Sequence, residues 1–270
     1  MHKPMPSTRE KRDPLVGHGQ GGAPRIQVSD LTITYNGEPA VVDVDLKLPP
    51  GCICGLVGMN GAGKSTLFKA LMGFVMPLRG QIHIDGLPVL QAQRSQAIAY
   101  VPQCEQVDWQ FPIRVWDVVM MGRYGRMNLL RWPSAADRHA VQEALKRVDL
   151  LPMRHRQIGA LSGGQRKRAF LARVIAQQAR VLLLDEPFTG VDIRTERLII
   201  DLLLEQRDHG MTVLIATHDL DAIPTFCDSV VLINRTVLAY GETSEVFTQA
   251  NLLRTFGAAP TLPCSHSRPR

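Results

Sequence analysis

The chain of 270 residues is expected to fold as an α/β protein with an antiparallel strand-rich opening and an inserted helical lobe. Three observations predict this. Leucine-rich and β-branched runs alternate with helical stretches after residue 180, which is typical of a parallel sheet covered on both faces. Residues 26–35 and 39–48 alternate with period two, as antiparallel edge strands do. Between these regions, residues 104–175 carry a helical pattern.

The first hundred residues contain mostly strands. Alternating polar and apolar side chains predict the first two, and CICGLVG at 52–58 runs directly into a glycine-rich loop and a helix. The predicted strands of this half are 26–35, 39–48, 52–58, 81–86 and 98–103, and the helix is 65–74.

The rest of the chain begins with helices and ends in alternating units. Ser134 followed by Asp137 resembles the cap that starts a helix. The predicted helices are 116–124, 134–150, 163–178 and 196–210, followed or separated by strands at 181–186 and 212–219, a short helix, and a hairpin over 229–241.

The tails differ from the body in composition and charge. Residues 1–24 are polar and broken by proline and glycine, so we expect a disordered N-terminal tail without a secretory signal. Of the net charge of +6, residues 1–25 contribute +3 and Arg268 and Arg270 add +2. About +1 remains for the body, which argues against nucleic acid as a partner, although anionic lipid near the tails stays open.

Two classes of protein are disfavoured by the apolar and cysteine patterns. No run approaches the ~18 consecutive apolar residues of a membrane-spanning helix. The five cysteines are odd in number and scattered, so free thiols are expected rather than a disulfide framework or a metal site. A cytoplasmic protein is the resulting expectation.

The segment 58–65, GMNGAGKS, fits the phosphate-binding pattern G-x-x-x-x-G-K-[ST] between a strand and a helix. Glycines allow successive N–H groups to surround a phosphate at a helix N-terminus. Lys64 would bridge the β- and γ-phosphates of ATP, Ser65 would bind Mg²⁺, and Thr66 would reach an inner phosphate. The loop itself contributes Gly58, Asn60, Gly61 and Gly63.

The apolar strand 181–186 ends in two carboxylates, at the edge where open α/β sheets bind ligands. Asp185 is placed to hold Mg²⁺, and Glu186 to orient or deprotonate an attacking water. Together with the glycine loop, they predict hydrolysis of a nucleoside triphosphate.

Three further residues are candidates for the same site. Gln103 could contact Mg²⁺ and the water, His218 could donate to the γ-phosphate, and Tyr35 could stack on adenine. Each also has a purely structural interpretation: a surface glutamine, a histidine at a strand end, and a tyrosine packed on its own sheet.

A second glycine turn, Ser162-Gly163-Gly164-Gln165, precedes another helix and predicts a second anion site. One triphosphate does not need two such turns in one chain. We therefore expect two copies facing head to tail, each serine-glycine turn covering the γ-phosphate held by the other copy. Hydrolysis would then remove the bridge and open the pair.

With these residues assembled, the chain resembles the ATPase subunits of ABC transporters over residues 25–245. In that family the pattern comprises the A-loop (Tyr35), Walker A (58–66), the Q-loop (Gln103), the LSGGQ signature (161–165), Walker B (181–186), the D-loop (Asp192) and the switch histidine (His218). The resemblance implies a P-loop NTPase (RecA-like) core, an antiparallel β subdomain and a helical subdomain at about 104–170, with a C-terminal helix and loose tail at 246–270. It also implies MgATP hydrolysis on the cytoplasmic face of a bacterial membrane, bound to permease subunits.

Residues 107–125 and 185–192 are similar to importers of manganese, iron and zinc. Their extracellular or periplasmic partner is a metal-binding protein, so the metal would not touch this chain. The similarity favours Mn²⁺ or Fe²⁺ over Zn²⁺ and leaves siderophore or haem uptake open. Trp109, Phe111, Met120 and Met121 are candidate permease contacts, or else core of the helical lobe.

Two other functions compete with transport. A soluble ATPase of the same superfamily usually carries two cassettes or a long coiled-coil insertion, and this chain has neither. A regulatory cassette without turnover is disfavoured because Lys64, Asp185, Glu186 and His218 are all present.

Overall fold

The computed structural model describes residues 23–103, 111–128 and 130–257. Its larger sheet has the strand order β10-β9-β3-β8-β7-β6, with all neighbours parallel except β9 and β10. Every residue of β3, β7 and β8 is buried, which explains their continuous apolar sequences. The strands are β3 (Ile53–Val57), β6 (Ile98–Val101), β7 (Val181–Asp185), β8 (Thr212–Thr217), β9 (Ser229–Asn234) and β10 (Thr236–Glu242).

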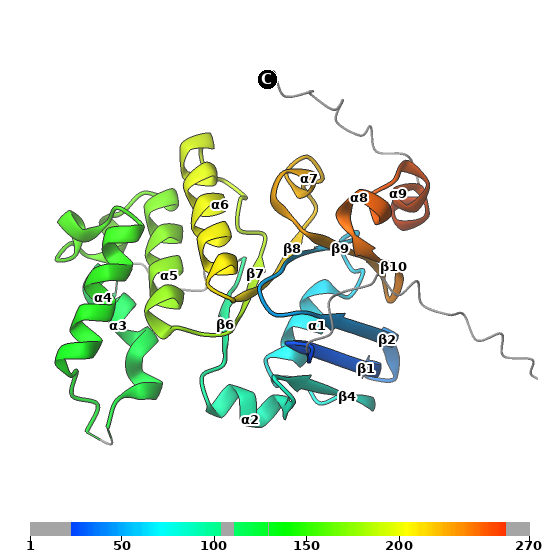
Figure 1. Ribbon diagram of the computed structural model, residues 1–270, viewed down its shortest axis with the longest axis horizontal. Helices are drawn as coiled ribbons and strands as arrows, with labels where there is room; N and C mark the ends of the chain where they lie inside the picture. Colours follow the sequence, from blue (N-terminus) through cyan, green and yellow to red (C-terminus); the bar gives the residue numbers. More distant parts are fainter. Residues whose placement is uncertain (1–22, 104–110, 129, 258–270) are drawn as a thin grey trace, which may run out of the picture.

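The smaller sheet is antiparallel, as expected, with the order β2-β1-β4-β5. Its core faces α1 (Lys64–Leu71): Leu67 and Phe68 of this helix share one buried cluster with Ile26 and Leu31 of β1 and with Leu56 of β3. Helix α1 is thereby held between the two sheets (Figure 1). The strands are β1 (Ile26–Tyr35), β2 (Glu38–Leu48), β4 (Arg79–Ile84) and β5 (Leu87–Pro88).

Helices α3 (Val115–Met120), α4 (Ala135–Arg147) and α5 (Gly163–Gln177) form the helical lobe (Figure 1). A buried ion pair holds it together: Arg123 Nε donates to Asp137 Oδ1 at 2.9 Å, and Arg123 Nη1 donates to the Ala176 carbonyl at 2.9 Å. The predicted cap at Ser134 is confirmed as a capping box with Asp137. Short 3₁₀ turns follow at Leu151–Met153 and Ile158–Ala160.

The predicted helix 116–124 was wrong in its second half, where the chain forms a 3₁₀ helix, Met121–Arg126. The backbone here lies against α5, and a Cβ on Gly122 would come within 2.2 Å of the Arg173 carbonyl oxygen. Met120 is 5% exposed and belongs to the core, whereas Phe111 and Met121 are 60% and 39% exposed. Trp109 lies outside the described residues.

The remaining helices cover the larger sheet and its edges. Helix α6 begins three residues before the predicted 196, because Asp192 caps it by accepting from the Thr195 N–H at 3.0 Å. Helix α2, which the sequence did not predict, follows β5. These helices are α2 (Val89–Arg94), α6 (Ile193–Asp208), α7 (Ile223–Phe226), α8 (Thr243–Val246) and α9 (Gln249–Phe256).

Cys52, Cys54 and Cys227 are buried free thiols, as expected; Cys104 and Cys264 lie outside the described residues. Throughout residues 23–103, 111–128 and 130–257, no helix is long and apolar enough to cross a bilayer.

Candidate functional site

The loop between β3 and α1 has the backbone that a phosphate cradle requires. Gly63 caps α1 with φ of +97°, and a Cβ there would lie 2.8 Å from the Ala40 carbonyl oxygen. A Cβ on Gly58 would lie 2.3 Å from the Ile233 carbonyl oxygen. Only glycine fits at these two positions without moving the backbone, so the tight curl of the loop is fixed by its sequence.

Lys64 is folded back onto this loop. It is 7% exposed, and its Nζ donates to the carbonyls of Gly58 at 2.7 Å and Met59 at 3.1 Å. Burial lowers the pKa of the lysine, and the nearby Glu186 and Asp185 carboxylates oppose that shift. The ammonium group is therefore held in place within the loop that the motif predicts for phosphate.

Two carboxylates end β7 next to the loop. Asp185 is 8% exposed, with Oδ2 3.4 Å from the Ser65 hydroxyl. Burial raises the pKa of Asp185, and the adjacent Glu186 carboxylate raises it further. A crowded pair of acids beside a hydroxyl is a donor set that suits Mg²⁺, so these residues fit the ion that the sequence predicts.

Glu186 is fixed by contacts on both its backbone and its side chain. Its backbone lies in the left-handed region, with φ of +51°, and its N–H donates to the Ala216 carbonyl at 2.9 Å. The carboxylate is 6% exposed and lies 2.7 Å from Nδ1 of His218, whose ring is 60% exposed. The two residues predicted for water activation and γ-phosphate contact are thus in direct contact with each other.

A cavity of 170 Å³ joins these groups. Gln103, Asp185 and Glu186 line it together with Ala40 and the loop. The loop residues that line it are Met59, Asn60, Gly61, Gly63, Lys64, Ser65 and Thr66. The cavity brings together residues predicted for MgATP from three separate parts of the sequence. Gly58 and His218 do not line it, and His218 is connected to it through Glu186.

Tyr35 and the serine-glycine turn lie apart from that cavity. Tyr35 ends β1 and is 43% exposed. Ser162 caps α5: its hydroxyl accepts from the Gln165 N–H at 3.3 Å, and the Gln165 side chain accepts from the Ser162 N–H at 3.0 Å. None of Tyr35, Ser162, Gly163, Gly164 and Gln165 lines the cavity.

Tyr100 is a site residue that the sequence reasoning missed. It lies on β6 opposite Leu183 of β7, and its hydroxyl is 3.5 Å from Asp185 Oδ2. Burial raises the pKa of the phenol to about 12, with a further contribution from Asp185, so the hydroxyl stays protonated beside the acid. The signal was its position three residues before Gln103 on a strand that had to lie beside β7.

No group of three or more histidine, cysteine, aspartate or glutamate side chains suited to a metal ion occurs in the part of the chain that the structure describes. The predicted Mg²⁺ ligands are too few to form such a group and would share the ion with phosphate oxygens and water.

Comparison with known proteins supports the assignment of this site to ATP binding and hydrolysis. The family model described as ABC transporter matches residues 41–189. The manganese transport system ATP-binding protein MntA of Synechocystis is 57% identical over 88% of this chain and 92% of its own length. The zinc transport system ATP-binding protein TroB of Treponema pallidum is 41% identical over 86% of each chain. The chelated iron transport system membrane protein YfeB of Yersinia pestis is 55% identical over 87% of this chain and 79% of its own length.

Solved structures agree on the fold. A metal-chelate type ABC transporter in an inward-facing conformation superposes with a TM-score of 0.77 at 30% identity, covering 88% of this chain and 90% of that one. The ADP conformation of MJ1267, an ATP-binding cassette at 21% identity, gives the same TM-score and supports the fold alone. The predicted α/β fold with a P-loop core is therefore confirmed, and the chain belongs to the ABC transporter family as one of its ATP-hydrolysing subunits.

Proposed function

We propose that this chain powers an importer of a divalent metal ion, Mn²⁺ or Fe²⁺, by binding and hydrolysing MgATP between two copies of itself. The observation that carries the proposal is a cavity that joins the glycine loop to Asp185 and Glu186, in a chain 57% identical to a manganese transport ATP-binding protein over most of its length. The metal-binding protein and the permease that would accompany it are partners outside this chain.

Binding of ATP would use groups that already converge on the loop. The first N–H groups of α1 and the Lys64 ammonium would contact the phosphates, and Lys64 would exchange its carbonyl contacts with Gly58 and Met59 for phosphate oxygens. Mg²⁺, when bound, would neutralise charge on the phosphates. Ser65, Asp185 and Gln103 would hold it, and Tyr35 would stack on the adenine ring.

Hydrolysis would depend on Glu186 and His218. The buried Glu186 carboxylate would orient the attacking water or accept its proton, and the histidine at 2.7 Å would keep that carboxylate in place and contact the γ-phosphate. The hydroxyl of Tyr100 would position Asp185.

The second copy would complete the site. Ser162, Gly163, Gly164 and Gln165 do not line the cavity of their own chain, which supports a role toward a partner. Each signature turn would cover the γ-phosphate on the other copy, adding donors and excluding water.

A second cavity, of 550 Å³, supports a place for the permease. Its lining includes Gln103, Val101 and, from helix α5, Phe170 and Leu171. It also extends to Asp185 and Glu186 of the nucleotide site. A helix of the permease inserted there would contact Gln103, which lines the nucleotide cavity as well. Transport would then be coupled to hydrolysis through Gln103.

Metal uptake in a deletion strain tests the proposal. The intact chain should restore uptake of radioactive Mn²⁺ or Fe²⁺, and Lys64→Ala should not. If the chain instead restores uptake of Zn²⁺ or of an iron chelate, that ion replaces the proposed one. Two relatives are named for transport of these substrates. If the protein stays soluble with and without a co-expressed permease, transport is contradicted.

A further inference from the structure

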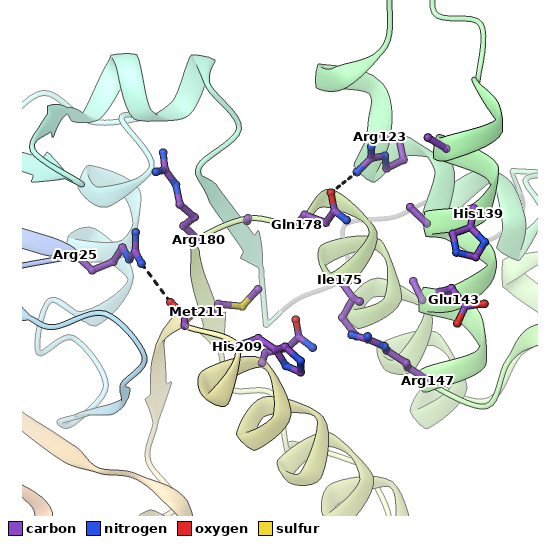
Figure 2. Close-up of a pocket in the computed structure, with 16 residues that line it drawn as sticks. Arg25, Arg123, His139, Glu143, Arg147, Ile175, Gln178, Arg180, His209 and Met211 are labelled. Carbon is purple, nitrogen blue, oxygen red and sulfur yellow. Dashed lines mark hydrogen bonds between the residues drawn. The ribbon is translucent and has the colours of Figure 1, made fainter.

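A cavity of 780 Å³ lies away from the nucleotide site, between the α/β core and the helical lobe (Figure 2). Arg180 and Met211, which line it, come just before β7 and β8, whereas the carboxylates of the hydrolytic site lie at the other end of β7. The cavity is therefore at the opposite edge of the parallel sheet. Its volume falls within the ~300–1,000 Å³ of small-molecule sites.

Basic side chains come from both walls of this cavity. Figure 2 shows Arg25, Arg180 and His209 on the side of the core, and His139 on the side of the helical lobe. Arg147 of α4 pairs with Glu205 of α6 at 3.4 Å, so it already connects the lobe to the core.

The charges around the cavity do not cancel. Asp85 is shared by two arginines: Arg25 contacts one carboxylate oxygen and Arg180 Nε lies 2.8 Å from the other. Elsewhere, Arg123 pairs with Asp137, Arg147 with Glu205, and Lys146 with the lining Glu143. One positive charge therefore remains, before either histidine is protonated.

Several donors are available to a ligand. The side chains of Arg180 and Arg147 are 50% and 41% exposed. His209 donates its Nδ1–H to the Glu205 carbonyl at 2.6 Å, so Nε2 accepts in the neutral ring and donates to an anion only in the imidazolium form. Gln206 lines the cavity and is 8% exposed, and its Nε2 has no hydrogen-bond partner among the residues described. A buried donor without an acceptor is uncommon and points to a missing partner.

We propose that this cavity binds a small oxyanion with more than one phosphate or carboxylate group, which contacts Arg180 and His209 on the core and Arg147 and His139 on the helical lobe. Such a ligand would tie the lobe to the core. It would bind independently of the P-loop and of which ion is transported.

Calorimetric titration of the full-length chain tests this, with ADP saturating the P-loop in buffer without divalent cations. The probes are inorganic pyrophosphate and citrate, which separate phosphate from carboxylate recognition. We expect at least one of them to bind with Kd at or below about 1 mM. The double variant Arg147→Gln/Arg180→Gln should weaken that binding at least ~10-fold, the loss of ~1.4 kcal/mol.

Two controls fix the location of the site. Arg138→Gln changes an exposed arginine of α4 that does not line the cavity, and it should bind the probe like the parent chain. Lys64→Ala should also retain binding. ATP turnover without probe should be unchanged in the double variant, and Arg180→Gln alone replaces it if the double variant unfolds.

Two results would overturn the proposal. The first is binding that Lys64→Ala abolishes and the double variant keeps, which would place the anion in the P-loop. The second is no binding of either probe at about 10 mM, which would leave the cavity as a gap between the lobes.

Discussion

The P-loop side and the signature side of this molecule are built in opposite ways. Lys64, Asp185 and Glu186 are each less than 10% exposed. They line one cavity of the same chain, where Asp185 also contacts the Ser65 hydroxyl. Ser162 and Gly163 are exposed, and the Ser162 hydroxyl bonds to the backbone of its own helix. Both turns lie at the start of a helix, but the P-loop lines the cavity that contains Asp185 and Glu186, whereas Ser162 and Gly163 do not.

This difference indicates which part of the reaction site a single chain lacks. The P-loop side holds the groups for phosphate, Mg²⁺ and water, so a single chain should bind ATP. The signature side offers its donors to the solvent, so a second copy should be needed for hydrolysis. Variants on the two sides should therefore separate binding from turnover.

The largest effect is expected at Glu186. Glu186→Gln should lower ATP turnover by ~10³-fold, because the buried carboxylate that activates water is lost. ATP binding should persist, and light scattering should detect a stable dimer with ATP and Mg²⁺. A variant that stays monomeric under these conditions would contradict an ATP site shared between two copies.

The signature serine should give the next largest effect. Ser162→Arg should reduce turnover by ~10²-fold or more, the size of losing one transition-state donor, while the Kd for ATP changes less than about twofold. The matched control is Ser134→Arg, because Ser134 caps α4 with the same type of capping box. That control should lose only about 1 kcal/mol of stability and keep its turnover. Equal losses of binding and turnover in Ser162→Arg would place the signature in its own chain's site.

Substitution of Tyr35 should change the affinity for ATP alone, which separates binding on the P-loop side from turnover. Tyr35→Ala should weaken ATP binding about 10-fold, within the ~1–3 kcal/mol of an aromatic–base stack, and Tyr35→Phe should restore it. Tyr124 is a similarly exposed tyrosine, 38% against 43%, in the helical lobe. Tyr124→Ala should leave the Kd unchanged, and an equal loss in both alanine variants would exclude stacking by Tyr35.

The smallest effect is expected on folding stability, which the neighbouring carboxylates of Asp185 and Glu186 reduce. Burial and Glu186 hold the pKa of Asp185 above its ordinary 3.8, so the folded chain binds this proton more tightly than the unfolded chain. Ionised Asp185 therefore lowers stability at neutral pH, and this cost disappears as pH falls through the raised pKa toward 3.8. Asp185→Asn should raise Tm at pH 7 by about 2–4 °C, the shift that ~1 kcal/mol gives.

That gain should shrink as the solution is acidified, measured by thermal unfolding from pH 7 downward. In the same variant, addition of Mg²⁺ should no longer raise the rate of ATP turnover. A constant difference in Tm across the pH range would show that the charge of Asp185 is not its cause.

Much of this site could be predicted from sequence because its residues sit at strand ends. The carboxyl ends of parallel strands share one edge, so the loop after β3 and the carboxylates after β7 had to converge once the sheet was recognised. The antiparallel sheet was predictable from its alternation, because β1 alternates buried and partly exposed side chains on either side of Asp30.

Other features depended on contacts that no local pattern contains. The 3₁₀ segment after Met120 reflects close packing of Gly122 on Arg173 of α5, more than 50 residues away. Tyr100 reaches Asp185 because β6 pairs with β7 in a particular register. The arginine-lined cavity combines α4 with the segment before β8, and its residues carry no motif.

The most direct test of the shared site is an experimental structure of the Glu186→Gln chain with MgATP. The account predicts two copies head to tail, with the Ser162 hydroxyl of each copy within hydrogen-bond distance of the γ-phosphate held by the other copy's P-loop. A closed, ATP-loaded dimer in which Ser162 lies away from both γ-phosphates would contradict it.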